Sequence, residues 1–223
     1  MLPVASGGWI VTPRPGGDRD VIPPPSSLLP DQHLDGSTLT IPVGATLTLA
    51  LDDHWWRFKD TAADAPLTRV AGPGGWLPDW GVKCSSTQAC HSDVTVYRAT
   101  SQGDTELDAE EDIPDGTLLP FHVRVIVSRP GSSPSFDIPA KTNLVEEAGV
   151  VRAPRGTSLA IRFPSSTWRL QPVRGASVLT FQSDTSLSFL HVIVRGSGEA
   201  ELVATQPGQS PAEDWDLIID AVG

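Results

Sequence analysis

Short stretches in which apolar and polar residues alternate recur along the whole chain, separated by glycine, proline and polar turns. The clearest are PFHVRVIV at 120–127 and WDLIIDAV at 215–222, where every second side chain is apolar. Such alternation is typical of strands in an antiparallel sheet that packs one face on a core and leaves the other in water. No segment has the length and period of a long helix. The pattern predicts an all-β protein.

The strand pattern occurs twice. A segment that starts near Ser37 aligns without gaps with one that starts near Gly149, at an offset of 112 residues. The later parts of the two repeats also align, and only the middle differs in length. The strongest matches are Pro42 with Pro154, Leu47, Leu49 and Leu51 with Leu159, Ile161 and Phe163, Trp56 with Trp168, and Phe121, Val123 and Val125 with Trp215, Leu217 and Ile219.

Each repeat therefore contains about seven short strands with frequent turns, as in an immunoglobulin-like sandwich. We expect two separate, tandem immunoglobulin-like β-sandwich domains. Trp56 and Trp168 stand where such domains place a buried central tryptophan. The predicted parts are a Pro/Gly-rich tether at 1–35, domain 1 at 36–128 with an insertion at 70–92, a Pro/Ser-rich linker at 129–144, and domain 2 at 145–223.

The first 35 residues are rich in proline and glycine and show no sustained period, which favours extended conformations. This segment is predicted to be a tether or a strap. Trp9, Ile10 and Val11 within it are either solvated or docked on a domain as an edge strand, and the sequence leaves both readings open.

Composition narrows the function classes. The net charge of −11 repels phosphate backbones, so nucleic acid is a poor partner. The apolar runs are far shorter than the ~18–20 residues of a membrane span. A protein with 39% hydrophobic residues still has enough apolar side chains to build a core.

The two cysteines, Cys84 and Cys90, flank five polar residues, and we expect them to form a disulfide. Zinc binding with His91 is the weaker alternative, because this spacing is not that of known zinc sites. A disulfide implies an oxidising compartment, so we expect the protein to be extracytoplasmic, either secreted or surface-tethered. No signal peptide is visible, as expected if a start Met had replaced a native signal or lipid anchor.

The sequence contains no recognisable catalytic motif. There is no GxSxG, no phosphate-binding loop, and no diagnostic spacing among His33, His54, His91, His122 and His191. We therefore expect no enzyme activity and no cofactor. The acidic stretch at 106–116 is predicted to be a strand end followed by a solvated loop, with a calcium site as the alternative.

The insertion at 70–92 carries Trp76 and Trp80 beside the predicted disulfide. Aromatic side chains on a stiffened loop make good binding anchors. The alternative is that both fold back over the open end of the sandwich as a small satellite core.

The order of these features, with PVGATL in the first strand pair, a tryptophan after it, and Gly72, Pro73, Gly74 and Gly75 in mid-domain, resembles the chagasin-type immunoglobulin-like family. That family inhibits papain-type cysteine peptidases through three loops at one end of the sandwich. The resemblance implies that the GPGG segment is the second of these loops. The other two motifs are absent, and the first loop position holds His54 and Trp55.

We therefore expect a non-enzymatic binding or scaffold protein with a protein, or alternatively a glycan, as its partner at the cell envelope. The candidate contact residues are His54, Trp55, Gly72, Pro73, Gly74, Gly75, Trp76 and Trp80. Inhibition of papain-type peptidases is the alternative function. No metal site is expected beyond the calcium alternative.

Overall fold

The computed structural model contains strands and a single short 3-10 turn among the residues that it describes. The all-β prediction is confirmed. The described residues are 6–12, 35–52, 56–71, 92–112, 118–140, 149–171, 173–182, 188–206 and 213–222.

The first repeat contributes seven strands to the described structure. In chain order they are β2 (Thr38–Pro42), β3 (Thr46–Asp52), β4 (Trp56–Phe58), β5 (Leu67–Ala71), β6 (Ser92–Ala99), β7 (Gly103–Asp112) and β8 (Leu118–Ser128).

The second repeat contributes seven equivalent strands and the 3-10 turn. They are β10 (Gly149–Pro154), β11 (Ser158–Arg162), β12 (Arg169–Leu170), η1 (Ala176–Val178), β13 (Leu179–Phe181), β14 (Phe189–Val194), β15 (Gly198–Gln206) and β16 (Glu213–Val222). The remaining two strands are β1 (Ser6–Thr12) and β9 (Ser135–Pro139), which precede the two repeats.

The strand pairing confirms the internal alignment. Ala109 on β7 is in register with Phe121, and its counterpart Ala204 on β15 is in register with Trp215. β4 starts at Trp56 and pairs with β7, and β12 directly follows Trp168 and pairs with β15. The two repeats therefore fold in the same way, strand for strand.

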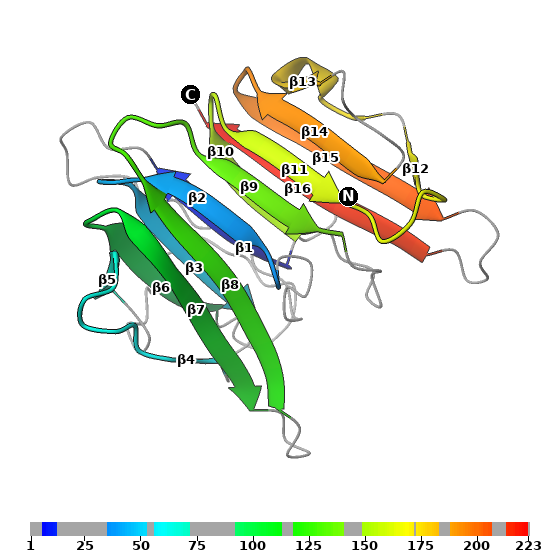
Figure 1. Cartoon of the computed structure of the whole chain (residues 1–223). Coiled ribbons are helices and arrows are strands. Elements are labelled where there is room, and N and C mark those ends of the chain that lie inside the picture. Colours follow the sequence, from blue (N-terminus) through cyan, green and yellow to red (C-terminus); the bar gives the residue numbers. More distant parts are fainter. Residues whose placement is uncertain are drawn as a thin grey trace, which may run out of the picture.

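The strands form two eight-stranded sheets that pack face to face (Figure 1). Sheet A has the order β12-β15-β16-β10-β1-β3-β6-β5, and sheet B has the order β13-β14-β11-β9-β2-β8-β7-β4. In sheet A, four strands of the second repeat (β12, β15, β16 and β10) continue through β1 into three strands of the first (β3, β6 and β5). In sheet B, four strands of the first repeat (β4, β7, β8 and β2) continue through β9 into three strands of the second (β11, β14 and β13). The expectation of two separate sandwiches is therefore wrong, because both sheets run through both repeats. The domain boundaries at 36–128 and 145–223 stay a prediction.

Two strands make the sheets continuous. β1 pairs antiparallel with β3 and parallel with β10, so the predicted tether contains an interior strand and not an edge strand. β9, from the predicted linker, pairs antiparallel with β2 and parallel with β11, and Figure 1 shows it between those strands. The physical reason is that β2, β3, β10 and β11 would otherwise be sheet edges with unpaired backbone groups.

The core runs through both repeats as one cluster. Phe136 and Ile138 of β9 are buried in it together with Leu39 of β2 and Leu159 of β11. In the second repeat Phe163 stacks on Trp168 with ring centroids 5.7 Å apart and meets the edge of Trp215 at 5.4 Å. Trp168 is 2% exposed, which agrees with its predicted place in the core.

Within the part of the chain described above, no helix is long and apolar enough to cross a bilayer.

Candidate functional site

The contact residues predicted from the sequence lie outside the described residues. This holds for His54, Trp55, Gly72, Pro73, Gly74, Gly75, Trp76 and Trp80, and for the predicted disulfide partners Cys84 and Cys90. Their roles stay predictions. The described residues contain a different candidate, the outward face of sheet B.

The alternation along the strands builds this face. Leu39, Phe136 and Leu159 point into the core, so their neighbours along β2, β9 and β11 point outward. We call the outward-facing residues of β14, β11, β9, β2 and β8 the sheet B face. It comprises His191, Ile193, Ser158, Ala160, Ser135, Asp137, Thr38, Thr40, Arg124 and Ile126, all at least partly exposed.

A row of short side chains crosses the middle of the sheet B face. Ile193 pairs with Ser158, Ser158 with Ser135, Ser135 with Thr40, and Thr40 with Ile126. The row runs without interruption from the second repeat through β9 into the first repeat. Its centre consists of three hydroxyl side chains, so no large group rises from the middle of the face.

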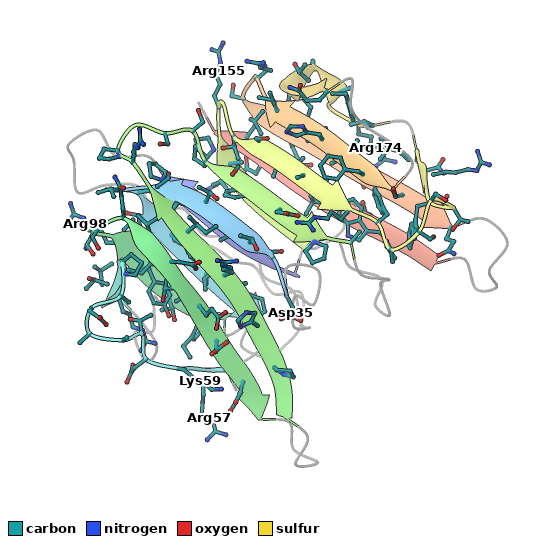
Figure 2. The ribbon with its side chains drawn as sticks, viewed as in Figure 1. Asp35, Arg57, Lys59, Arg98, Arg155 and Arg174 are labelled. Carbon is teal, nitrogen blue, oxygen red and sulfur yellow. The ribbon has the colours of Figure 1, made fainter. Side chains whose placement is uncertain are left out.

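Charged pairs border the row on the side of the first repeat. Arg124 Nε donates to Asp104 at 2.9 Å, and His122 Nδ1 lies 2.6 Å from Asp108 Oδ1. Lys59 Nζ lies 2.7 Å from Glu110, and Figure 2 shows Lys59 beside β4 at this margin. The acidic residues at 104, 106, 108 and 110 occupy alternate, outward positions of β7.

These contacts shift the ionisation of the groups involved. The hydrogen bond from the Arg124 guanidinium lowers the pKa of Asp104, and the hydrogen bond to Glu110 raises the pKa of Lys59. In each pair the partner stabilises the charged form. The margin of the face thus carries fixed, paired charges at neutral pH.

The second-repeat half of the face contains one ion pair and one hydroxyl–imidazole pair, which reach in to β9 and to the row itself. Arg162 Nε donates to Asp137 Oδ1 at 2.8 Å, joining β11 to β9. Ser158 Oγ lies 2.6 Å from His191 Nε2, and the ring of His191 is 6.1 Å from that of Phe189.

The outward face of sheet A differs because three of its outward positions are buried. Thr48, Val96 and Ile218 alternate with core residues and so lie on that outward side, yet they are only 1%, 5% and 8% exposed. Val96 and Ile218 are buried without being part of the core cluster. The sheet B face is therefore the more accessible of the two broad faces.

The Ser158–His191 pair is the arrangement that most resembles catalytic machinery, since an imidazole beside a hydroxyl can act as its base. Acyl transfer also needs preorganised donors that converge on the developing oxyanion. The Ser158 N–H instead donates to the Pro134 carbonyl at 3.0 Å, as part of the bonding between β11 and the β9 side of the sheet. This pair therefore fits a surface hydrogen bond better than a nucleophile.

The acidic stretch at 106–116, which we expected to be a strand end followed by a solvated loop, is a strand as far as it is described. Its described part, up to Asp112, belongs to β7, which is paired on both sides with β8 and β4. The reason is that Leu107 and Ala109 face the core and hold the strand in the sheet. Among the described residues there is no group of three or more His, Cys, Asp or Glu that could hold a metal ion; Asp115 lies outside them.

The sequence reasoning missed the sheet B face because it assigned 129–144 to a linker. The signal was present in SFDIP at 135–139, where buried Phe136 and Ile138 alternate with Ser135 and Asp137. A second signal was the threonine alternation TLTIP at 38–42.

Comparison with known proteins shows low similarity throughout. No protein-family model and no curated protein matches the chain. An endo-fucoidan hydrolase from glycoside hydrolase family 107 matches with a TM-score of 0.25 and 9% identity. The match covers 88% of this chain but only 30% of that enzyme.

Immunoglobulin-like and cadherin-type structures are similar to the same degree. The tandem Ig repeats of Dlar match at 11% identity and a TM-score of 0.25, over 85% of this chain and 98% of that one. Extracellular cadherin domains 3–6 of protocadherin gamma B2 match at 10% identity and a TM-score of 0.25, over 82% and 44% of the two chains. At these TM-scores the likenesses assign neither a family nor an activity.

Proposed function

We propose that this chain is a non-enzymatic binding or scaffold protein that holds a protein partner on the sheet B face. The observation that carries the proposal is the row from Ile193 through Ser135 to Ile126, which crosses both repeats without interruption. Because β9 joins the repeats, the two ends of the row are fixed relative to each other. A preorganised surface loses little conformational entropy on binding.

The shape of the face favours a protein over a small molecule. Five strands at a spacing of about 4.8 Å give a surface about 19 Å across. Small ligands bind in concave sites that enclose most of their surface, whereas protein partners cover broad areas. The row itself is uncharged, and the charged side chains Asp137 and Arg124 beside it are each in an ion pair, which agrees with the depletion of charged residues at the core of protein interfaces.

The net charge of −11 limits the class of partner. A partner with a neutral or basic surface would meet the face without long-range repulsion, and an acidic one would be slowed. The predicted disulfide between Cys84 and Cys90 supports an extracytoplasmic setting for this encounter.

The insertion at 70–92 is the second candidate contact surface, because it carries Trp76 and Trp80 beside the predicted disulfide. Chagasin-like inhibition of papain-type peptidases would use the same region through Gly72–Gly75. Two of the three inhibitory motifs are absent, so we expect no inhibition of papain at micromolar concentrations of this protein. Nanomolar inhibition of papain would favour the alternative.

The test is a matched pair of substitutions. Thr40→Arg places a long charged side chain in the centre of the sheet B face, and Thr68→Arg places it on exposed β5 of sheet A. Wild-type protein immobilised on beads would be used to identify binding partners from envelope extract, and their affinity would then be measured with purified components. We expect Thr40→Arg to weaken binding at least tenfold and Thr68→Arg to leave it unchanged, with both variants folded by circular dichroism.

Loss of binding in a Trp76→Ala, Trp80→Ala double variant, with full binding by Thr40→Arg, would contradict the proposal and assign the contact to the insertion. Binding of a purified glycan in place of a protein would contradict the partner class.

A further inference from the structure

β1 differs from β9, the other strand that joins the two repeats, in how it is attached. β9 follows β8 after six residues, 129–134, and precedes β10 by nine, 140–148. β1 is separated from β2 by 25 residues, 13–37, a stretch that contains six of the proline residues predicted for the tether. Fully extended, a chain of this length spans about 80–90 Å.

The place that β1 occupies is a slot with two strand edges. On one side it is in register with five residues of β3, from Thr46 to Ala50. On the other it is in register with four residues of β10, from Gly149 to Arg152, with a shift of register between Ser6 and Gly8. We call the gap between β3 and β10 the β3–β10 slot.

The slot is continuous with the core on its inner side. Leu49 of β3 and Val151 of β10 are 2% and 0% exposed, and both are in register with Trp9. An empty slot would leave two rows of backbone donors and acceptors unpaired and would open the core beside Leu49 and Val151. The slot therefore requires a strand, and the sequence SGGWIVT fits it in length and register.

We propose that the β3–β10 slot of one molecule also accepts residues 6–12 of a second molecule, which gives a strand-exchanged dimer. The contacts in the slot are the same whether β1 comes from its own chain or from a second copy. The balance between the two arrangements is therefore set by the connection between β1 and β2. For two groups joined by a connection of about this length, the effective concentration is of roughly millimolar order. Exchange is therefore minor in dilute solution and becomes substantial when the local concentration approaches that range.

A second copy is the occupant that the structure supports, because residues 6–12 of every copy have the sequence and register that fit both edges of the slot. Reciprocal exchange of β1 fills both slots and closes the assembly as a symmetric dimer. The proposal is independent of the sheet B face, because it uses interior edges of sheet A.

Two full-length variants with different tags test it, both carrying Cys84→Ser and Cys90→Ser. One carries Thr12→Cys and the other Thr46→Cys, positions that are in register between β1 and β3. They are mixed, unfolded in urea, refolded together at about 10 µM or about 1 mM, and oxidised. We expect a disulfide-linked heterodimer whose yield rises at least tenfold between the two concentrations.

The matched control pairs Thr12→Cys with Thr68→Cys. Thr68 and Thr46 are both in register with Arg98, so Thr68 belongs to the same row but lies two strands farther from β1, about 14 Å away. A third protein with Thr12→Cys and Thr46→Cys in one chain should close an internal disulfide at low concentration. This shows that the two positions meet when β1 occupies its own slot.

Two results would overturn the proposal. In one, the single-chain protein closes internally, but the mixed variants at 1 mM give no more heterodimer than the Thr68→Cys control. In the other, the single-chain protein forms no internal disulfide, which would mean that β1 does not occupy the slot at all.

Discussion

Leu49, in the first repeat, and Val151, in the second, are both in register with the same residue, Trp9 of β1. The two repeats therefore meet in one sheet through a strand that belongs to neither. β9 does the same in sheet B, where Phe136 lies between Leu39 and Leu159. The joint between the repeats is thus bonded on both layers of the sandwich.

This arrangement predicts that damage in one repeat is felt in both. Trp168→Ala removes a 2% exposed side chain that stacks on Phe163, and such truncations cost about 3–5 kcal/mol. The measurement is amide hydrogen exchange during unfolding in urea. We expect the free energy of opening of the most protected amides to fall in both repeats together. An unchanged first repeat would show that the two units fold independently.

Trp168→Phe is the control for this substitution. The indole Nε1 of Trp168 is buried and has no hydrogen-bond partner among the described residues. Phenylalanine keeps an aromatic ring against Phe163 and removes that donor. We expect a smaller loss, under about 2 kcal/mol, because a buried unpaired donor is itself destabilising.

Gly175 provides a test of backbone packing in the second repeat. Its φ is +66°, and a Cβ at this position would lie 2.0 Å from the Glu199 carbonyl oxygen. Gly44 also has a positive φ, +89°, but has open space around it. Gly44→Ala should cost about 1–2 kcal/mol from backbone conformation alone.

Gly175→Ala should cost more, above about 3 kcal/mol, because β15 must move away from the new methyl group. Thermal unfolding of both variants measures the difference. Equal losses in the two variants would mean that Gly175 does not approach β15 as closely as described.

The charged margin of the sheet B face makes a prediction about pH. The hydrogen bond from Arg124 lowers the pKa of Asp104. The pair therefore stabilises the fold fully at pH values above the ordinary pKa of an aspartate, about 3.9. This stabilisation is lost as the pH falls through the lower pKa of the folded state. Both side chains are well exposed, so solvent screens the pair and its contribution to stability is small.

Carboxyl NMR titration of the wild type and of Arg124→Met checks this. We expect the pKa of Asp104 to rise in the variant, and the difference in stability between the two proteins to shrink as the pH falls through the folded-state pKa of Asp104. Arg98→Met, on β6 of sheet A, is the matched control and should leave Asp104 unchanged. An unshifted Asp104 in Arg124→Met would show that the hydrogen bond is not made in solution.

Cys84 and Cys90 are predicted to form a disulfide bond. A loop this short contributes at most roughly 2–3 kcal/mol through chain entropy, so reduction should loosen the insertion and leave both sheets intact. Mass spectrometry of alkylated, unreduced protein measures the number of free thiols. Two alkylated cysteines would contradict the prediction, and loss of the far-UV circular dichroism spectrum on reduction would contradict its local role.

The strands within each repeat were predictable because alternation and the internal alignment carry local information. Phe121 and Trp215 could be matched from sequence, and the register confirms them. β1 and β9 were harder to predict. They are short strands in Pro-rich surroundings, and what fixes them is the unpaired edges of strands far away in the sequence. That is a property of the assembled sheets, which no local pattern expresses.

The candidate site, like the fold, could be predicted only in part from the sequence. The outward positions of β2 and β11 could be read from their alternation, as at Thr38 and Thr40. Their union into one face depends on Ser135 and Asp137 of β9, and hence on the pairing that the sequence did not reveal.

Amide hydrogen exchange of β1 tests the continuous sheet most directly. An interior strand bonds alternate amides to opposite neighbours, so the consecutive amides of Trp9, Ile10 and Val11 should all be protected, to a degree similar to that of Thr48 and Leu49. Protection of only every second amide would mean that β1 is an edge strand. Exchange of all three at the rate of an unstructured peptide would mean that 1–35 is a tether, and would contradict the account.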